Sequence, residues 1–155
     1  MKRIDKLEIL EAQKNLADRI VGIGKAFLRK EDYNELAKKM IDDLYGYNEG
    51  PVLFKPTKAG QKQFRLTKAG AVSYFVGKNE DFPEDHGFAL QPWKKMRYEN
   101  SGFIFYEDHA LVMGNYYFMD LSENETKVEF SLGYFRTETG ALKINLHHSS
   151  LPYRS

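Results

Sequence analysis

The sequence contains no cysteine among its 155 residues. Disulfide bonds, thiolate catalysis and zinc sites built on cysteine are therefore excluded. This absence is compatible with a reducing compartment, and we expect the protein to be cytoplasmic. Export is left open at this point, since a leader peptide can be removed from a mature chain.

The sequence also lacks an excess of charge of one sign and lacks a long apolar run. It carries 23 Lys and Arg residues against 22 Asp and Glu residues, a formal net charge of +1. Such a balance gives no overall field to attract nucleic acid or an anionic membrane surface. No stretch approaches the roughly 20 apolar residues that span a bilayer. We therefore expect neither nucleic acid nor a membrane as a partner.

Aromatic residues, in contrast, are abundant, with 10 Tyr and 11 Phe. A strand-rich protein whose curved sheet encloses apolar space makes good use of them. The length is close to the commonest size of one domain, and no repeat or linker interrupts the chain. We therefore expect a single domain over residues 1–155.

The chain changes character once, between Gly46 and Pro51. Before this point, apolar residues recur at three- and four-residue steps, which predicts helices over much of residues 1–46. The second helix is expected to open at Glu31 and Asp32 and to stop at Gly46. Gly22 and Gly24 interrupt the first helical pattern, and they indicate either close packing or a bend.

After Pro51 the chain is predicted to consist mainly of strands, over residues 51–153. Short apolar runs separated by turn residues predict strands at 52–54, 71–76, 94–98, 102–106, 110–118, 127–134 and 141–150. The even spacing of the last strands indicates an antiparallel meander. Helices followed by strands predict the α+β class, with a cone-like, mostly antiparallel sheet wrapped around the N-terminal helices. Such a cone leaves a pocket at its open end, where ligands commonly bind.

Four histidines, His86, His109, His147 and His148, are the candidate metal ligands. Their spacing matches no known zinc pattern on a strand or a helix. Adjacent strand residues point to opposite faces, so His147 and His148 cannot both enter one pocket without a bulge. We therefore predict no metal site.

The segment from Leu142 to Ser150 alternates between two faces. One face carries Leu142, Ile144, Leu146, His148 and Ser150, and the other carries Lys143, Asn145, His147 and Ser149. A fully polar strand face is either exposed to solvent or lines a wet pocket, and alternation alone leaves both interpretations open.

Two hydroxyl groups lie next to short apolar runs. Thr57 follows a strand that ends at Pro56, and Tyr74 lies inside the run Ser73-Tyr74-Phe75-Val76. The structural interpretation is strand termination for Thr57 and core packing for Tyr74.

Taken together, these segments resemble the iota class of carbonic anhydrases. The likeness runs from about Gly50 to the C-terminus and is most specific at the end of the chain. It rests on Val52-Leu53-Phe54-Lys55-Pro56-Thr57, Ser73-Tyr74-Phe75-Val76-Gly77, Glu84-Asp85-His86-Gly87-Phe88-Ala89-Leu90, Pro92-Trp93, Met113-Gly114-Asn115-Tyr116, Lys127-Val128-Glu129-Phe130 and Leu146-His147-His148-Ser149-Ser150-Leu151-Pro152-Tyr153.

The resemblance implies a nuclear-transport-factor-2-like fold, related to the association domain of calcium/calmodulin-dependent kinase II. It implies a lyase that reversibly hydrates carbon dioxide to bicarbonate. It also implies a polar pocket without a metal or other cofactor, although dependence on manganese or zinc stays open. A homodimer or higher homo-oligomer is expected on the same ground.

The resemblance further assigns substrate binding and catalysis to Thr57, Tyr74 and Ser149, with Thr67 as an alternative for Thr57. Strand alternation adds His147 beside Ser149, as a proton shuttle with a pKa near 6.5. His148 and Ser150 are secondary candidates.

Two other functions remain open from the sequence. The first is a non-catalytic ligand-binding or oligomerisation module, whose interface would use Tyr116-Tyr117-Phe118 and Tyr134-Phe135. The second is an isomerase or cyclase with a carboxylate base in an apolar pocket, for which Glu99 and Glu129 are candidates.

Overall fold

The computed structural model describes residues 2–155, and its first two elements are the helices α1 (Lys6–Leu28) and α2 (Tyr33–Leu44). A capping box starts α1, because the Asp5 carboxylate accepts a hydrogen bond from the Glu8 backbone and the Glu8 carboxylate accepts one from Asp5. A Cβ atom on Gly24 would lie 2.8 Å from the carbonyl oxygen of Ala89. Gly24 therefore marks close packing of α1 rather than a bend.

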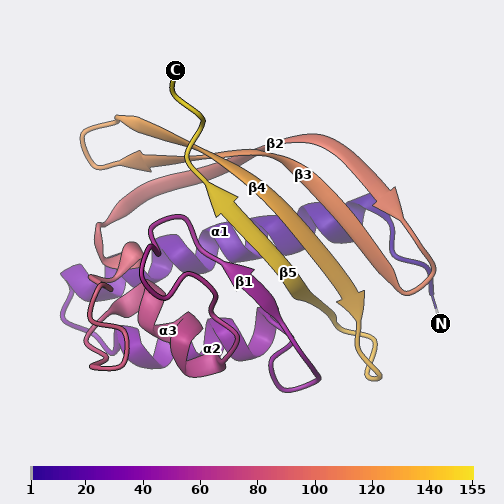
Figure 1. Ribbon diagram of the computed structural model, residues 1–155, viewed down its shortest axis with the longest axis horizontal. Coiled ribbons are helices and arrows are strands. Elements are labelled where there is room, and N and C mark those ends of the chain that lie inside the picture. Colours follow the sequence, from indigo (N-terminus) through magenta and orange to yellow (C-terminus); the bar gives the residue numbers. More distant parts are fainter. Residues whose placement is uncertain (1) are drawn as a thin grey trace.

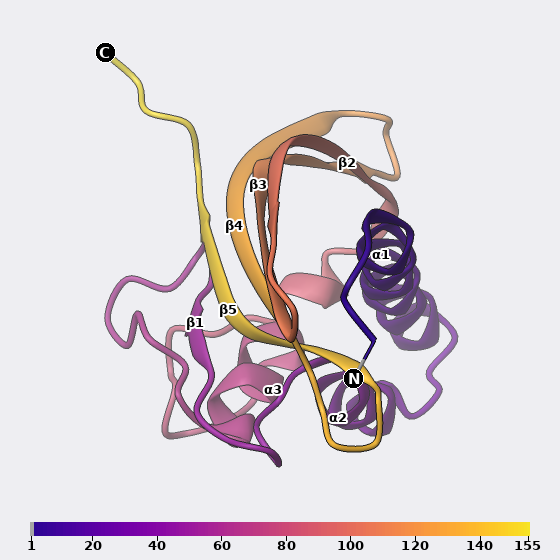
Figure 2. The same cartoon turned by 90° about the vertical axis from the view of Figure 1, so that its right-hand side faces the viewer.

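The second half of the chain forms one five-stranded sheet. Its strands are β1 (Leu53–Lys55), β2 (Trp93–Phe105), β3 (His109–Asp120), β4 (Glu125–Arg136) and β5 (Leu142–Ser150), in the order β1-β5-β4-β3-β2. The last four form an antiparallel meander, whereas β1 pairs with β5 in parallel. The sheet curves strongly and α1 lies across its concave side (Figures 1 and 2). This is the predicted α+β architecture; the assignment to one domain stays a prediction.

The strand expected at Ala71–Val76 is wrong, because these residues belong to the helix α3 (Lys68–Val76). The Thr67 side chain caps the helix by accepting a hydrogen bond from the Gly70 backbone at 3.2 Å. Gly77 ends it with a φ of +69°. A short apolar run does not by itself distinguish a strand from a buried helix, which explains the error.

The break expected around Asn100 is also wrong, since β2 runs through it as one strand. A register shift between Asn100 and Gly102 marks a bulge that absorbs the irregular residues. Gly114 on β3 faces this bulge, and a Cβ atom there would collide with the carbonyl oxygen of Glu99 and lie 2.9 Å from Asn100 Cα. The bulge and the glycine therefore form one feature of the sheet.

Most of the aromatic residues considered for a subunit interface lie inside the cone instead. Tyr116, Phe118 and Tyr134 are 3%, 2% and 1% exposed and belong to the main hydrophobic core. That interface prediction is therefore wrong for these three residues.

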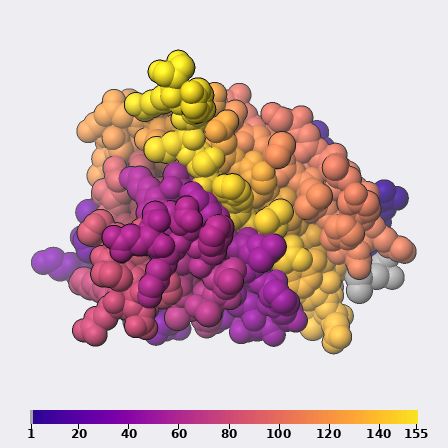
Figure 3. Space-filling view, in the orientation of Figure 1, coloured from indigo at the N-terminus to yellow at the C-terminus, as the bar shows by residue number. Residues whose placement is uncertain are grey.

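On the outer surface, β5 lies between β1 with its following loop and the residues of β4 (Figure 3). Within residues 2–155, no helix has the length and apolar character required to cross a membrane.

Candidate active site

A small cavity lies inside the cone, between α1, β1, α3, the short 3₁₀ helix η1 (Phe88–Leu90) and the sheet. It offers about 20 Å³ to the centres of water-sized molecules, and one buried water needs about 10–15 Å³ on this measure. The cavity therefore fits a ligand of only a few heavy atoms. Its walls divide into an apolar part (Ile20, Phe54, Pro56, Phe75, Phe88, Met96 and Phe118) and a polar part (Thr57, Tyr74, Tyr116, His147 and Ser149).

The strand β5 supplies two of the polar groups because of a bulge. Leu146 pairs with Gly133 and Ile144 with Tyr134, so Asn145 is the extra residue. The bulge exchanges the two faces, and Ile144, His147 and Ser149 all point inward. The faces predicted from the sequence are therefore right for the residues after Asn145. They are wrong before it, because Ile144 shares the inner face with His147 and Ser149.

The hydroxyl groups of Ser149 and Tyr116 meet at one nitrogen of His147. The Ser149 Oγ and the Tyr116 Oη each lie 3.1 Å from the His147 Nε2, and the two hydroxyls are hydrogen-bonded to each other. The other ring nitrogen, Nδ1, lies 2.8 Å from the Tyr45 Oη. The ring of Phe54 on β1 stacks on the imidazole at 4.9 Å. His147 is thus fixed on both edges and on one face.

Thr57 and Tyr74 line the same cavity from β1's following loop and from α3. The Tyr74 Oη accepts a hydrogen bond from the Lys58 backbone at 3.2 Å. Burial raises the pKa of both Tyr74 and Tyr116, while the hydrogen bond from the Lys58 backbone to Tyr74 and the one between Ser149 and Tyr116 lower it to a lesser degree. Both phenols therefore keep their protons at neutral pH. Thr67 caps α3 instead, so Thr57 is the threonine of the cavity.

Burial changes the chemistry expected of His147. The imidazole is 4% exposed, and removal from water lowers its pKa to about 3. Our premise that it titrates near 6.5 is therefore wrong, and the ring is neutral at physiological pH. A neutral imidazole can hold hydroxyl groups in place, but it is a poor proton shuttle.

The remaining candidates lie away from the cavity. His148 and Ser150 line a groove on the outer face of the sheet, and His86 and His109 are exposed. Glu99 is 57% exposed and ion-paired with Arg97, and Glu129 is exposed as well, so neither supplies the carboxylate that an isomerase needs. Across residues 2–155, no three His, Asp or Glu side chains come together as a metal site.

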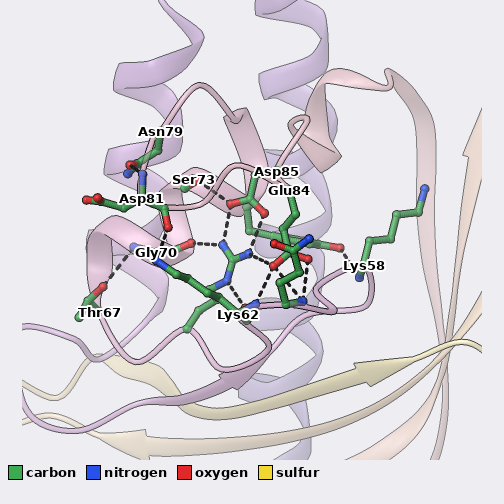
Figure 4. Close-up of polar contacts among 12 residues, drawn as sticks. Lys58, Lys62, Thr67, Gly70, Ser73, Asn79, Asp81, Glu84 and Asp85 are labelled. Atoms are coloured by element: carbon green, nitrogen blue, oxygen red, sulfur yellow. Dashed lines mark hydrogen bonds and ion pairs between the residues drawn. The ribbon is translucent and has the colours of Figure 1, made fainter.

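A buried ion pair holds the loop between β1 and α3 in place. The Arg65 guanidinium, fully buried, donates two hydrogen bonds of 2.7 Å to the Asp85 carboxylate, which also accepts one from the Ser73 hydroxyl. Glu84 accepts hydrogen bonds from the backbone of residues 60–62, which lowers its pKa to about 2. Figure 4 shows the side chains of Ser73, Glu84 and Asp85 in this cluster. The pair therefore fixes the loop of Thr57 against the helix of Tyr74.

Sequence reasoning missed Tyr45 and Tyr116 as parts of the site. The sequence gives Tyr116 a place in a family motif and in a candidate interface but no role in the site, although its alternation with Phe118 along β3 is an inward pattern. Tyr45 carries no local signal, because its contact with His147 spans 102 residues of chain.

Comparison with known proteins assigns the chain to a family. The family model of metal-independent carbonic anhydrases matches residues 7–151. The chain belongs to this family. A curated metal-independent carbonic anhydrase from Nostoc sp. is 42% identical over 155 residues, covering 98% of this chain and 76% of the relative.

Solved structures agree with the family assignment. A crystal structure of the iota-carbonic anhydrase from a cyanobacterium, complexed with bicarbonate, is 42% identical, has a TM-score of 0.96, and the match covers 99% of this chain and 95% of that chain. A structure described as a calcium/calmodulin-dependent kinase II association domain, from Xanthomonas campestris, has a TM-score of 0.61 at 15% identity, covering 100% and 97%. This second likeness concerns the fold alone.

Proposed function

We propose that this metal-independent carbonic anhydrase reversibly hydrates carbon dioxide to bicarbonate in the cavity beside Ser149. The observation that carries the proposal is the division of the cavity into an apolar wall and a hydroxyl-rich wall. Carbon dioxide is apolar and enters the first environment readily, whereas bicarbonate needs the hydrogen-bond donors of the second. The small volume suits both species and excludes larger substrates.

In the hydration direction, a water oxygen bonds to the carbon of carbon dioxide while one C=O electron pair moves onto its oxygen. Negative charge therefore develops on that oxygen, and the water loses one proton to solvent water at the mouth of the cavity. Hydroxyl donors already pointing at this oxygen stabilise the charge without reorganising. Apolar walls strengthen each hydrogen bond by excluding water, and they hold the reactants together.

We assign this donor role to Thr57, Tyr74 and Ser149, and we add Tyr116 because its hydroxyl is bonded to that of Ser149. His147 orients the Ser149 and Tyr116 hydroxyls through its Nε2 atom. The outer-face residues His148 and Ser150 have no part in this proposal.

A stopped-flow assay of carbon dioxide hydration tests the proposal. Protein stripped of metal and assayed with a chelator is expected to keep its full rate above the buffer background. Ser149→Ala and Tyr74→Phe should each lower kcat about 100-fold, the range measured when one oxyanion donor is removed. His148→Gln on the outer face is the matched control and should change kcat less than twofold. A wild-type rate equal to background would end the proposal, and full activity in both variants would end the site assignment.

We also propose a homodimer formed through the outer face of the sheet. This face exposes apolar side chains at Ile104, Leu111 and Met113, and exposed apolar patches commonly serve as interfaces. Light scattering during size-exclusion chromatography measures the mass in solution. The mass of one chain would contradict this part of the proposal.

A further inference from the structure

Tyr45 occupies a rigid position between the helices and the sheet. It ends α2, where its backbone N–H donates to the Ile41 carbonyl at 3.0 Å, and it forms an isolated parallel bridge with Ile144 on β5. Its side chain is fully buried, and its ring lies 5.4 Å from that of Phe54. The hydroxyl is thus held against the His147 imidazole by two elements at once.

The hydrogen-bond partners of the Tyr45 hydroxyl determine whether it donates or accepts. Across residues 2–155, the His147 Nδ1 atom is the one hydrogen-bond partner of the Tyr45 hydroxyl. Burial raises the pKa of Tyr45, so the hydroxyl keeps its proton. A buried O–H group without an acceptor costs about 1–3 kcal/mol. The Tyr45 hydroxyl therefore donates to Nδ1, and the imidazole proton of neutral His147 must lie on Nε2.

The position of this proton decides how many donors face the cavity. Ser149 and Tyr116 own two hydroxyl protons, and their mutual hydrogen bond uses one of them. When Nε2 carries a proton, it donates to an oxygen of this pair, and the second hydroxyl proton is free to bind a substrate oxygen. When Nε2 is unprotonated, it accepts a hydrogen bond from the second hydroxyl, and the pair has no donor left for the substrate.

We propose that Tyr45 is a positioning residue that holds His147 as its Nε2–H tautomer and so keeps one hydroxyl donor of the Ser149–Tyr116 pair directed at the substrate. The inference rests on the proposed function, because it concerns the donors of the same cavity. Tyr45 itself does not touch the substrate, since it is not among the residues that line the cavity.

Tyr45→Phe tests the proposal because it removes the oxygen alone. Tyr134→Phe is the matched control, since the Tyr134 hydroxyl is equally buried, lies outside the cavity lining, and has no partner among residues 2–155. We expect Tyr45→Phe to lower kcat about tenfold or more with KM changed less than threefold. Tyr134→Phe should leave both constants within twofold of the wild type.

Nitrogen-15 NMR of histidine-labelled protein gives a readout that does not depend on activity. The His147 signals, assigned by their loss in His147→Gln, should show a bare Nδ1 and a protonated Nε2 in the wild type. Tyr45→Phe should replace this single tautomer with a mixture, because Nδ1 then has no donor, whereas Tyr134→Phe should keep it. A protonated Nδ1 in the wild type would overturn the inference, and so would Tyr45→Phe behaving like Tyr134→Phe in both measurements. A wild type that does not hydrate carbon dioxide would instead overturn the proposed function, while the NMR result still judges the tautomer.

Discussion

His147 couples the stability of the protein to pH. Burial lowers its pKa to about 3 in the folded state, whereas an unfolded chain takes up the proton near pH 6.5. The unfolded state therefore binds more protons between these values, and folding stability is complete above about pH 6.5 and falls as the pH decreases toward 3. The limiting slope is about 1.4 kcal/mol per pH unit.

This predicts that His147→Gln flattens the pH dependence between pH 6.5 and 5, as measured by urea unfolding at a series of pH values. The exposed histidine variant His86→Gln is the control and should keep the wild-type slope. Equal slopes in the wild type and in His147→Gln would show that the imidazole is not held neutral.

At the residue scale, the family resemblance and strand alternation together predicted more of the candidate site than the local residue chemistry could predict alone. The structure brings together Thr57, Tyr74, His147 and Ser149, which were chosen by resemblance and strand alternation, while their roles stay predictions. Tyr45 could not be found in this way. Its contact depends on the parallel bridge between Tyr45 and Ile144 of β5 and on the end of α2, which no local pattern reports.

Among the structural elements, the paired bulge of β2 and Gly114 of β3 gives a direct test. Gly114→Ala would place a methyl group against the backbone of Glu99 and Asn100, which cannot yield as a flexible side chain can. We expect a loss of about 1–3 kcal/mol in the free energy of unfolding, the usual cost of overpacking. Gly102→Ala is the matched control, because nothing lies within 4 Å of its added Cβ atom. Urea unfolding that gives the same stability for both variants would contradict this account of the bulge.

The elements also show where sequence periodicity stops being informative. The two N-terminal helices and the meander were predictable because each buries one face and exposes the other. The helix α3 was not, since residues 70–76 are almost all buried and carry no periodic contrast. The bulge at Asn145 was not predictable either, because its position depends on the register with β4.

At the scale of the whole molecule, the Arg65–Asp85 pair connects three consecutive segments, which are the loop before α3, α3 itself and the loop after it. Asp85→Asn would remove the carboxylate that pairs closely with the buried guanidinium and leave the Glu84 carboxylate at 3.9 Å. Breaking a buried pair costs up to about 3–5 kcal/mol. Asp18→Asn removes the partner of Lys14 in an exposed ion pair and should cost less than about 1 kcal/mol. Chemical unfolding compares the two. A loss of under 1 kcal/mol in Asp85→Asn would mean that the pair does not stabilise the loop. If the pair does stabilise the loop, KM for carbon dioxide should rise in Asp85→Asn.

The contact between Tyr45 and His147 joins residues 102 positions apart, and this separation bears on how the protein reaches its working form. Such distant contacts carry a large loop-closure entropy and tend to form late during folding. Helices and hairpins can therefore be complete before the hydroxyl groups of the candidate active site have come together. Recovery of enzymatic rate after dilution from denaturant should lag behind recovery of secondary structure, so that catalysis itself reports the last step of maturation.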